Sequence, residues 1–275
     1  MGDIRIQRNK KALIGSVYYN KYNEKCTIID YNGTFDVIVQ LDNGYIFHTR
    51  YGQLMNKTWK TPYSKSVYEV GYLGIGDYMP STGNHYNNHN ELSENYDAWV
   101  SMLQRCYSTL PQDKKKFKNY EDCSVCEEWH NFQNFAKWFD ENKWECDEKL
   151  AIDKDIIVKH NKIYSPSTCI LVPQTINSCF TKRQNYRGDL PIGVTKTSKL
   201  IIKPYVARVN CIITDRKTKR KYLGTYATPE EAFQVYKKYK EQEIKCVADL
   251  YKSKYPQFPQ KVYDAMYSYQ VEITD

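Results

Sequence analysis

Hydrophobic and polar positions follow a strand-like pattern near the start of the chain. Four short runs rich in β-branched and aromatic residues lie between residues 12 and 63: ALIGSVYYN, KCTIIDY, FDVIVQLDN and YIFHTRY. The pairs Asn32-Gly33 and Asn43-Gly44 separate them and are hairpin signals, because a primed turn needs positive φ at both central residues. The pattern predicts a small β-barrel over residues 1–63.

The spacing changes to a helical one after a segment without periodicity. Residues 64–95 are rich in Gly, Asn, Tyr and Ser, which favours a linker. Apolar residues then recur three and four positions apart from Tyr96 to Tyr107, which predicts a helix. A second helix is expected around residues 129–139, with one apolar stripe: Trp129, Phe132, Phe135, Ala136 and Phe139.

Residues 150–177 (LAIDKDIIVKHNKIYSPSTCILVPQTIN) predict a strand, a turn, a second strand and a helix. Asp153, Lys154 and Asp155 stand together in the first strand. The second apolar run begins at Cys169, and Pro173 is expected in the first turn of the helix. Carboxylates at a strand end that faces a helix can hold a divalent metal against a phosphate. A structural hairpin with a solvated charged edge is the alternative.

Residues 193–245 predict three strands followed by a helix. The strands begin at Gly193, Tyr205 and Lys221, and Thr228 is the expected N-cap, with Pro229 as first helical residue. The last residues, 246–275, predict a cap of two short helices that are interrupted between Pro256 and Pro259. The expected fold class is therefore α+β with several domains.

Positive charge gathers in the same C-terminal region. The chain carries a formal net charge of +8, and residues 182–249 hold 16 Lys and Arg against 7 Asp and Glu. A helix on one face of a three-stranded sheet leaves the other face free to enter the major groove of double-stranded DNA. The expected DNA-binding residues are Lys196, Lys199, Lys203, Tyr205, Arg208, Arg216, Lys219, Arg220 and Tyr222. A solvated basic face is the alternative.

The cysteines favour a reducing, cytoplasmic setting over a disulfide framework, because their number, nine, is odd and their spacing is irregular. Cys123 and Cys126 have a spacing found in zinc sites, but no second such pair follows, so buried thiols are the favoured interpretation and structural Zn²⁺ the alternative. No apolar run reaches the length of a membrane span, and the first residues do not form a signal peptide.

Two family resemblances together cover about residues 96–245. The segments YDAWVSMLQRCY, VCEEWHNFQNFAKWFDEN, LAIDKDI, NKIYSPSTC and LVP resemble bacteriophage HNH-endonuclease-like proteins. The segments GVTK, KPYVARV, KYLGTY and TPEEA resemble the Apetala/ethylene-response-factor type DNA-binding domain, which often follows the HNH unit in such proteins. The resemblance implies an HNH-like ββα unit over 96–185 and an Apetala-type domain over 188–245. The barrel before them is expected to be Tudor-like on the strand pattern alone.

The HNH resemblance also implies chemistry. In that family a His activates water, an Asn orients it, and a further His or Asn on the helix helps to hold a metal that polarises the scissile phosphate. The His position falls on Lys154, the Asn position near Thr168 and the helix position on Asn177. Asp153 and Asp155 flank Lys154 and favour its protonated form, which leaves His160 as the nearby residue of suitable pKa. The expected metal ligands for Mg²⁺ or Mn²⁺ are Asp153, Asp155 and Asn177.

Three functional hypotheses follow. The first is a metal-dependent DNA endonuclease that hydrolyses phosphodiester bonds in the cytoplasm of the infected host cell. The second is a non-catalytic DNA-binding protein on an HNH scaffold. The third is a phage factor that binds a host protein through its N-terminal barrel; none of the three involves a membrane.

Overall fold

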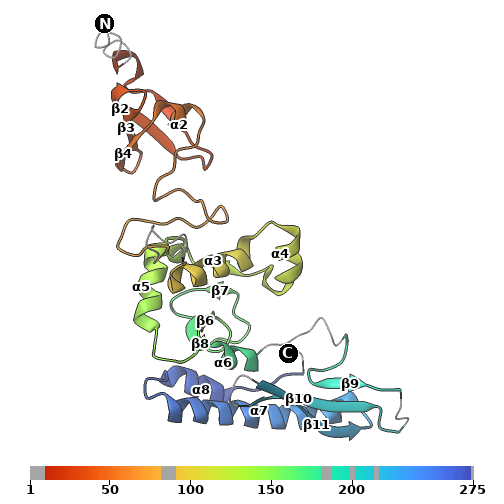
Figure 1. Cartoon of the computed structure of the whole chain (residues 1–275). Coiled ribbons are helices and arrows are strands. Elements are labelled where there is room, and N and C mark those ends of the chain that lie inside the picture. Colours follow the sequence, from red (N-terminus) through yellow and green to blue (C-terminus); the bar gives the residue numbers. More distant parts are fainter. Residues whose placement is uncertain (1–9, 82–90, 181–187, 199–201, 214–216, 274–275) are drawn as a thin grey trace. The chain divides into compact units, whose positions relative to one another are not determined.

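The computed structural model describes residues 10–81, 91–180, 188–198, 202–213 and 217–273, and it divides the chain into two compact units, residues 1–137 and 138–275. The fold class is α+β, as predicted, with several small sheets (Figure 1). Within the described residues, no helix combines the length and the apolar character that crossing a membrane requires.

The N-terminal strands form an antiparallel sheet in the order β1-β2-β3-β4: Val17–Tyr19, Lys25–Gly33, Asp36–Leu41 and Ile46–Thr49. Alternate residues of β2 and β3 point into one core because side chains of a strand alternate between its faces. That core also takes in Leu54 of helix α2 (Tyr51–Met55) and Trp59. The described strands do not close into the predicted barrel, because the chain leaves β4 as a helix and not as a further strand.

Both predicted hairpins are confirmed, but not as primed turns. β2 pairs with β3 and β3 with β4 at the two Asn-Gly pairs. Gly33 and Gly44 have positive φ (136° and 87°), whereas neither Asn32 nor Asn43 does. The side chain of Asn43 instead accepts a hydrogen bond from the amide of Tyr45, 3.0 Å away, which closes the turn locally.

The rest of the first unit is built on aromatic packing. It contains α3 (Glu94–Tyr107), α4 (Pro111–Lys116), the short helix η1 (Lys118–Tyr120), β5 (Ser124–Val125), η2 (Glu127–His130) and the start of α5 (Phe132–Asn142). Trp99 is fully buried beside Phe132 and donates its indole N–H to the carbonyl of Trp129. Residues 71–78, in the segment expected to be a linker, are held to α5 because Gln133 hydrogen-bonds the backbone of Leu73 and Tyr78.

The second unit contains β6 (Leu150–Asp153), β7 (Ile163–Tyr164), β8 (Ile170–Pro173) and α6 (Gln174–Cys179). A three-stranded antiparallel sheet follows in the order β11-β10-β9, from Lys217–Tyr226, Tyr205–Ile213 and Val194–Lys196. Helix α7 (Pro229–Lys254) packs on one face of this sheet (Figure 1). The hydrophobic core between the sheet and the helix includes Val209, Ala232 and Phe233. The predicted sheet and helix are thereby confirmed.

The C-terminal end differs from the prediction of two short helices. Helix α7 runs without interruption through the expected boundary at residue 245, and only α8 (Gln260–Ser268) is separate. The reason is that Ile244, Val247, Ala248 and Tyr251 continue its buried stripe at helical spacing. Residues after α8 then return to the core, where Val271 is buried.

Candidate functional site

Strand β6 and strand β8 form the hairpin expected for residues 150–177. Leu150 pairs with Pro173 and Asp153 with Ile170, and α6 follows directly after β8. Pro173 is the N-cap of α6 rather than its first helical residue, because its backbone is still extended (ψ 148°). The order strand, turn, strand and helix is therefore confirmed, with β6 ending at Asp153.

Asp153 closes the turn that follows β6. Its Oδ1 accepts hydrogen bonds from the amides of Asp155 (2.8 Å) and Ile156 (2.7 Å). Burial raises the pKa of this carboxyl group, the two amides oppose the shift, and the charge of Asp155 adds to it. One oxygen of the Asp153 side chain is thus occupied by two hydrogen bonds from the backbone.

Lys154, where the HNH resemblance implies a His, is buried and hydrogen-bonded within the same turn. Its Nζ donates to Oδ2 of Asp155 at 2.7 Å and to the backbone carbonyl of Asn161 at 2.6 Å. The ammonium group also lies 5.9 Å from the centre of the Tyr164 ring. Both hydrogen bonds use the nitrogen as a donor, and an ammonium group has no acceptor with which to take a proton from water.

Asn161 is a structural residue of this site that the sequence analysis did not single out. Its side-chain nitrogen donates to the carbonyls of Lys154 (3.1 Å) and Ile163 (2.7 Å), and its oxygen accepts from the amide of Ile163. The available signal was an Asn within a polar turn, where this side chain often hydrogen-bonds nearby backbone. Asn161 therefore fixes the loop that carries His160.

The other predicted catalytic residues are not brought to Asp153. His160 has positive φ (63°), its side chain is 57% exposed, and its Nε2 lies 3.5 Å from Glu272 near the C-terminus. Thr168 donates to the carbonyl of Ile163 at 3.0 Å. In the described part of the chain, no hydrogen bond joins the side chain of Asn177 to Asp153 or Asp155.

The donor set around Asp153 does not fit the predicted divalent metal. One oxygen of Asp153 accepts two amides, and Asp155 is paired with the ammonium of Lys154. A divalent cation beside these carboxylates would compete with that ammonium for the same negative charge. No group of three or more His, Cys, Asp or Glu side chains suited to a metal occurs within the described ranges. Cys123 and Cys126 are not joined by a disulfide bond.

Glu148 links this hairpin to α7 and was also missed by sequence reasoning. Its carboxylate accepts from the hydroxyl of Thr175 in α6 at 2.5 Å and from the hydroxyl of Tyr251 in α7. Burial and the bond to Glu148 raise the pKa of Tyr251, so this phenol stays protonated and donates. The partners are 27 and 103 residues away from Glu148, a separation for which local pattern carries no signal.

The predicted DNA-binding residues are divided between the two faces of the β9–β11 sheet. Arg208 pairs with Tyr222 and Asn210 with Arg220 across β10 and β11, so these four share one face. The intervening Ala207 and Val209 are in the core under α7, so the face with Arg208, Tyr222 and Arg220 is the one without a helix. Arg208 reaches Thr195 on β9 at 3.4 Å, and the side chain of Tyr222 is 58% exposed. We call this surface the open sheet face.

Lys196 and Tyr205 pair with each other on the opposite side. Tyr205 packs against the core under α7, and the ammonium of Lys196 lies 5.6 Å from its ring centre. Lys203 is exposed in the connection between β9 and β10. Lys199 and Arg216 lie outside the described residues, and so does the side chain of Lys219.

Lys221 lies on the face of the sheet opposite to that of Arg220. It follows Arg220 directly in β11 but pairs with Val209, and its Nζ donates to the hydroxyl of Tyr239 on α7 at 2.8 Å. Two consecutive residues of β11 thus point to opposite faces, Arg220 to the open sheet face and Lys221 to the helix.

No family model, no curated protein and no solved structure matches this chain.

Proposed function

We propose that this protein binds double-stranded DNA through the open sheet face. The observation that carries the proposal is that Arg208, Arg220 and Tyr222 share the face that α7 leaves uncovered. Guanidinium groups make bidentate contacts to phosphates and to guanine edges, and a sheet of this width can enter the major groove. The phage-type resemblance would place this DNA in the cytoplasm of an infected host cell.

The test compares two neighbouring cations on β11. Arg220→Gln removes a charge from the open sheet face, and Lys221→Gln removes the same charge from the face under α7. We expect Arg220→Gln to weaken binding to a fluorescent DNA duplex about 10-fold and to reduce the slope of log affinity against log salt by about 1. Lys221→Gln should bind the duplex with an affinity within about twofold of the wild type. The reason is that the Lys221 side chain lies on the face under α7, so its loss removes no phosphate contact.

The comparison can reject the proposal in two ways. Equal losses in both variants would mean that total charge, and not the open sheet face, governs binding. No loss in Arg220→Gln, nor in the double variant Arg208→Gln/Arg220→Gln, would place DNA elsewhere on the protein or exclude it. Thermal unfolding of each variant shows whether the sheet still folds.

Metal-dependent cleavage is the second candidate, and the β6–β8–α6 arrangement favours it because the HNH resemblance implies the same order. For cleavage with Mg²⁺ or Mn²⁺, Asp155 would have to be released by Lys154. The assay incubates plasmid DNA with either metal and the wild type, Asp155→Asn or His160→Ala. A matched control is Asp147→Asn, an exposed aspartate paired with Lys254 in the same unit.

Nicking that is lost in Asp155→Asn and retained in Asp147→Asn would establish the endonuclease. Intact plasmid under both metals, together with a normal band shift on the same preparation, would leave DNA binding without cleavage. Nicking that survives both Asp155→Asn and His160→Ala would point to a contaminating nuclease.

A further inference from the structure

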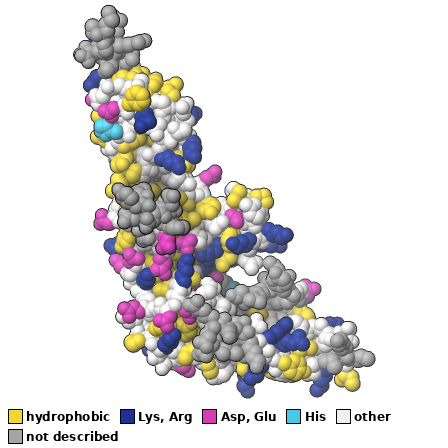
Figure 2. Space-filling view, in the orientation of Figure 1, with side chains coloured by type: hydrophobic (Ala, Val, Ile, Leu, Met, Phe, Trp, Pro, Cys, Tyr) yellow, Lys and Arg dark blue, Asp and Glu magenta, His cyan; other side chains and the backbone are white. Residues whose placement is uncertain are grey.

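Helix α4, in the first unit, carries a dense group of exposed cations. Lys114, Lys115 and Lys116 form its last three residues, and Lys118 begins η1 directly afterwards. All four side chains are exposed. Figure 2 shows Lys and Arg side chains gathered over α4. We call Lys114, Lys115, Lys116 and Lys118 the α4 lysine cluster.

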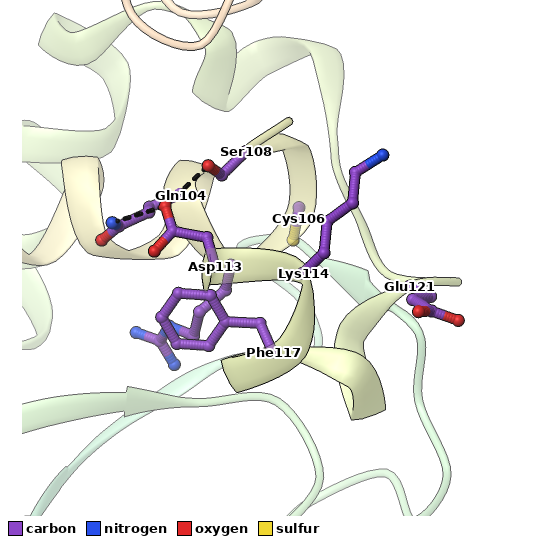
Figure 3. Close-up of a pocket in the computed structure, with 8 residues that line it drawn as sticks. Gln104, Cys106, Ser108, Asp113, Lys114, Phe117 and Glu121 are labelled. Atoms are coloured by element: carbon purple, nitrogen blue, oxygen red, sulfur yellow. Dashed lines mark hydrogen bonds between the residues drawn. The ribbon is translucent and has the colours of Figure 1, made fainter. Parts of the chain in front are cut away.

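The nearest acid does not neutralise the cluster through a salt bridge. Asp113 is buried and accepts hydrogen bonds from the hydroxyl of Ser108 (2.6 Å) and the side chain of Gln104 (3.0 Å), as Figure 3 shows. These two bonds, and the nearby charge of Lys116, lower the pKa of Asp113. Over the described ranges, no salt bridge is formed by any of the four lysines. Their charge is therefore available to a partner in solvent.

Aromatic rings and an arginine lie beside the cluster. The ammonium of Lys116 is 4.8 Å from the ring centre of Phe117, and Phe117 packs edge-to-face on Tyr120 at 6.2 Å. The guanidinium of Arg105 lies 5.8 Å from the ring centre of Tyr120. Rings that alternate with cations suit nucleic acid, which offers phosphates and apolar sugar and base surfaces together.

A small hollow adjoins the cluster between α3 and α4 (Figure 3). Its volume is about 240 Å³, and its lining comes from Gln104, Arg105, Cys106, Ser108, Asp113, Lys114, Phe117 and Glu121. Sites that enclose a free small molecule usually measure about 300 to 1,000 Å³. The hollow is thus better suited to receive part of a polymer that lies across the surface than to enclose a separate ligand.

We propose that the α4 lysine cluster binds the phosphate backbone of DNA and forms a second contact surface, separate from the open sheet face. A membrane fits less well, because a helix that lies in a membrane interface needs a long apolar face, and α4 has six residues with Leu110 as the exposed apolar side chain at its start. The proposal extends the proposed function to the first unit and shares its ligand, but it does not depend on Arg208 or Arg220.

The experiment uses the full chain and one fluorescent DNA duplex. The cluster variant is Lys114→Gln/Lys115→Gln/Lys116→Gln/Lys118→Gln. The matched control removes the same charge from four exposed lysines elsewhere in the first unit: Lys11, Lys21, Lys60 and Lys65, each replaced by Gln. Affinity is measured over about 50 to 200 mM salt, where each lost phosphate contact reduces the slope by about 1. Thermal unfolding confirms that both variants fold.

We expect the cluster variant to bind at least about 10-fold more weakly and to lose about 3 to 4 from the salt slope, with the control near wild type. Equal losses in the two variants, or an unchanged slope in the cluster variant, would overturn the cluster proposal. The two proposals fail separately. If the cluster variant binds normally while Arg220→Gln does not, the open sheet face alone binds DNA. If Arg220→Gln binds normally while the cluster variant does not, the α4 lysine cluster binds DNA and the proposal for the open sheet face is rejected.

Discussion

The ammonium nitrogen of Lys154 lies 2.6 Å from the carbonyl oxygen of Asn161, seven residues farther along the chain. The side chain of Asn161 returns the contact by donating to the carbonyl of Lys154 at 3.1 Å. These two reciprocal bonds close the turn after β6. Lys154, where the HNH resemblance implies a His, is therefore a structural clamp for the loop in which His160 stands.

Lys154→Met tests this clamp. The methionine would leave the Asn161 carbonyl and the Asp155 carboxylate without the buried donor, at a cost of about 1 to 3 kcal/mol in the free energy of unfolding. Lys162→Met, which replaces an exposed lysine of the same turn, should change stability by less than about 0.5 kcal/mol. Urea unfolding measures both; similar values for the two variants would show that the clamp adds nothing.

Asp153 gives a prediction with a defined pH dependence. Burial raises its pKa above the ordinary 3.8, so the folded protein holds this proton more tightly than the unfolded chain. The charged carboxylate consequently costs stability as the pH rises from 3.8 through the raised pKa. Asp153→Asn keeps an oxygen acceptor for both amides and removes that charge, so we expect its stability relative to the wild type to increase across this window.

Asp153→Ala is the matched variant without an acceptor. It loses both backbone bonds, and we expect it to be about 1 to 2 kcal/mol less stable than Asp153→Asn at neutral pH. Chemical unfolding over a pH series checks the order. Equal stability of the Asn and Ala variants would show that the two amide contacts contribute nothing.

Asp113→Ala should loosen α4, the helix that carries most of the α4 lysine cluster. The variant loses the acceptor for Ser108 and Gln104, so we expect a lower melting temperature than that of Asp122→Ala, an exposed acid nearby. Because the pKa of Asp113 is lowered, the wild type's advantage is complete above the ordinary pKa and disappears as the pH falls through the lowered one. A difference in melting temperature that does not change with pH would contradict this assignment.

The segment after α8 should stabilise the second unit. Val271 is buried in the core under α7, its carbonyl accepts from Lys237 at 2.6 Å, and its amide donates to Glu241 at 2.8 Å. Val271→Ala should cost about 1 to 3 kcal/mol. Ile273→Ala, at a side chain that is 45% exposed, is the control and should have little effect. Thermal unfolding of both variants distinguishes a docked segment from an undocked one.

Features that depend on neighbouring residues could be predicted from the sequence. Thr228 caps α7 as expected, because its hydroxyl accepts from the amide of Glu231 at 3.2 Å and the side chain of Glu231 returns a bond to the amide of Ala227. The two hairpins at Gly33 and Gly44 also follow from local turn chemistry. Even there, the predicted form of the turn was wrong, since neither Asn32 nor Asn43 has positive φ.

Features that depend on distant residues could not be predicted. The sequence shows Lys154 between two aspartates, and only the folded turn shows that its ammonium reaches Asn161 and is buried. Glu148 meets Tyr251 across 103 residues, and Glu272 meets His160 from the C-terminal end. Strand alternation could have assigned Arg220 and Lys221 to opposite faces, but the shift in register between Ala207 and Arg208 decides which face each one takes.

Helix α7 also fixes how two parts of the second unit are rotated relative to each other about the helix axis. Its first half packs on the sheet through Phe233 and Tyr236, and Tyr251, near its other end, bonds Glu148 beside the ββα hairpin. A straight helix of this length is a rod of about 39 Å. One residue inserted between Tyr239 and Ile244 would turn one end relative to the other by about 100°. Insertions or deletions in this stretch should therefore be tolerated only in whole helical repeats.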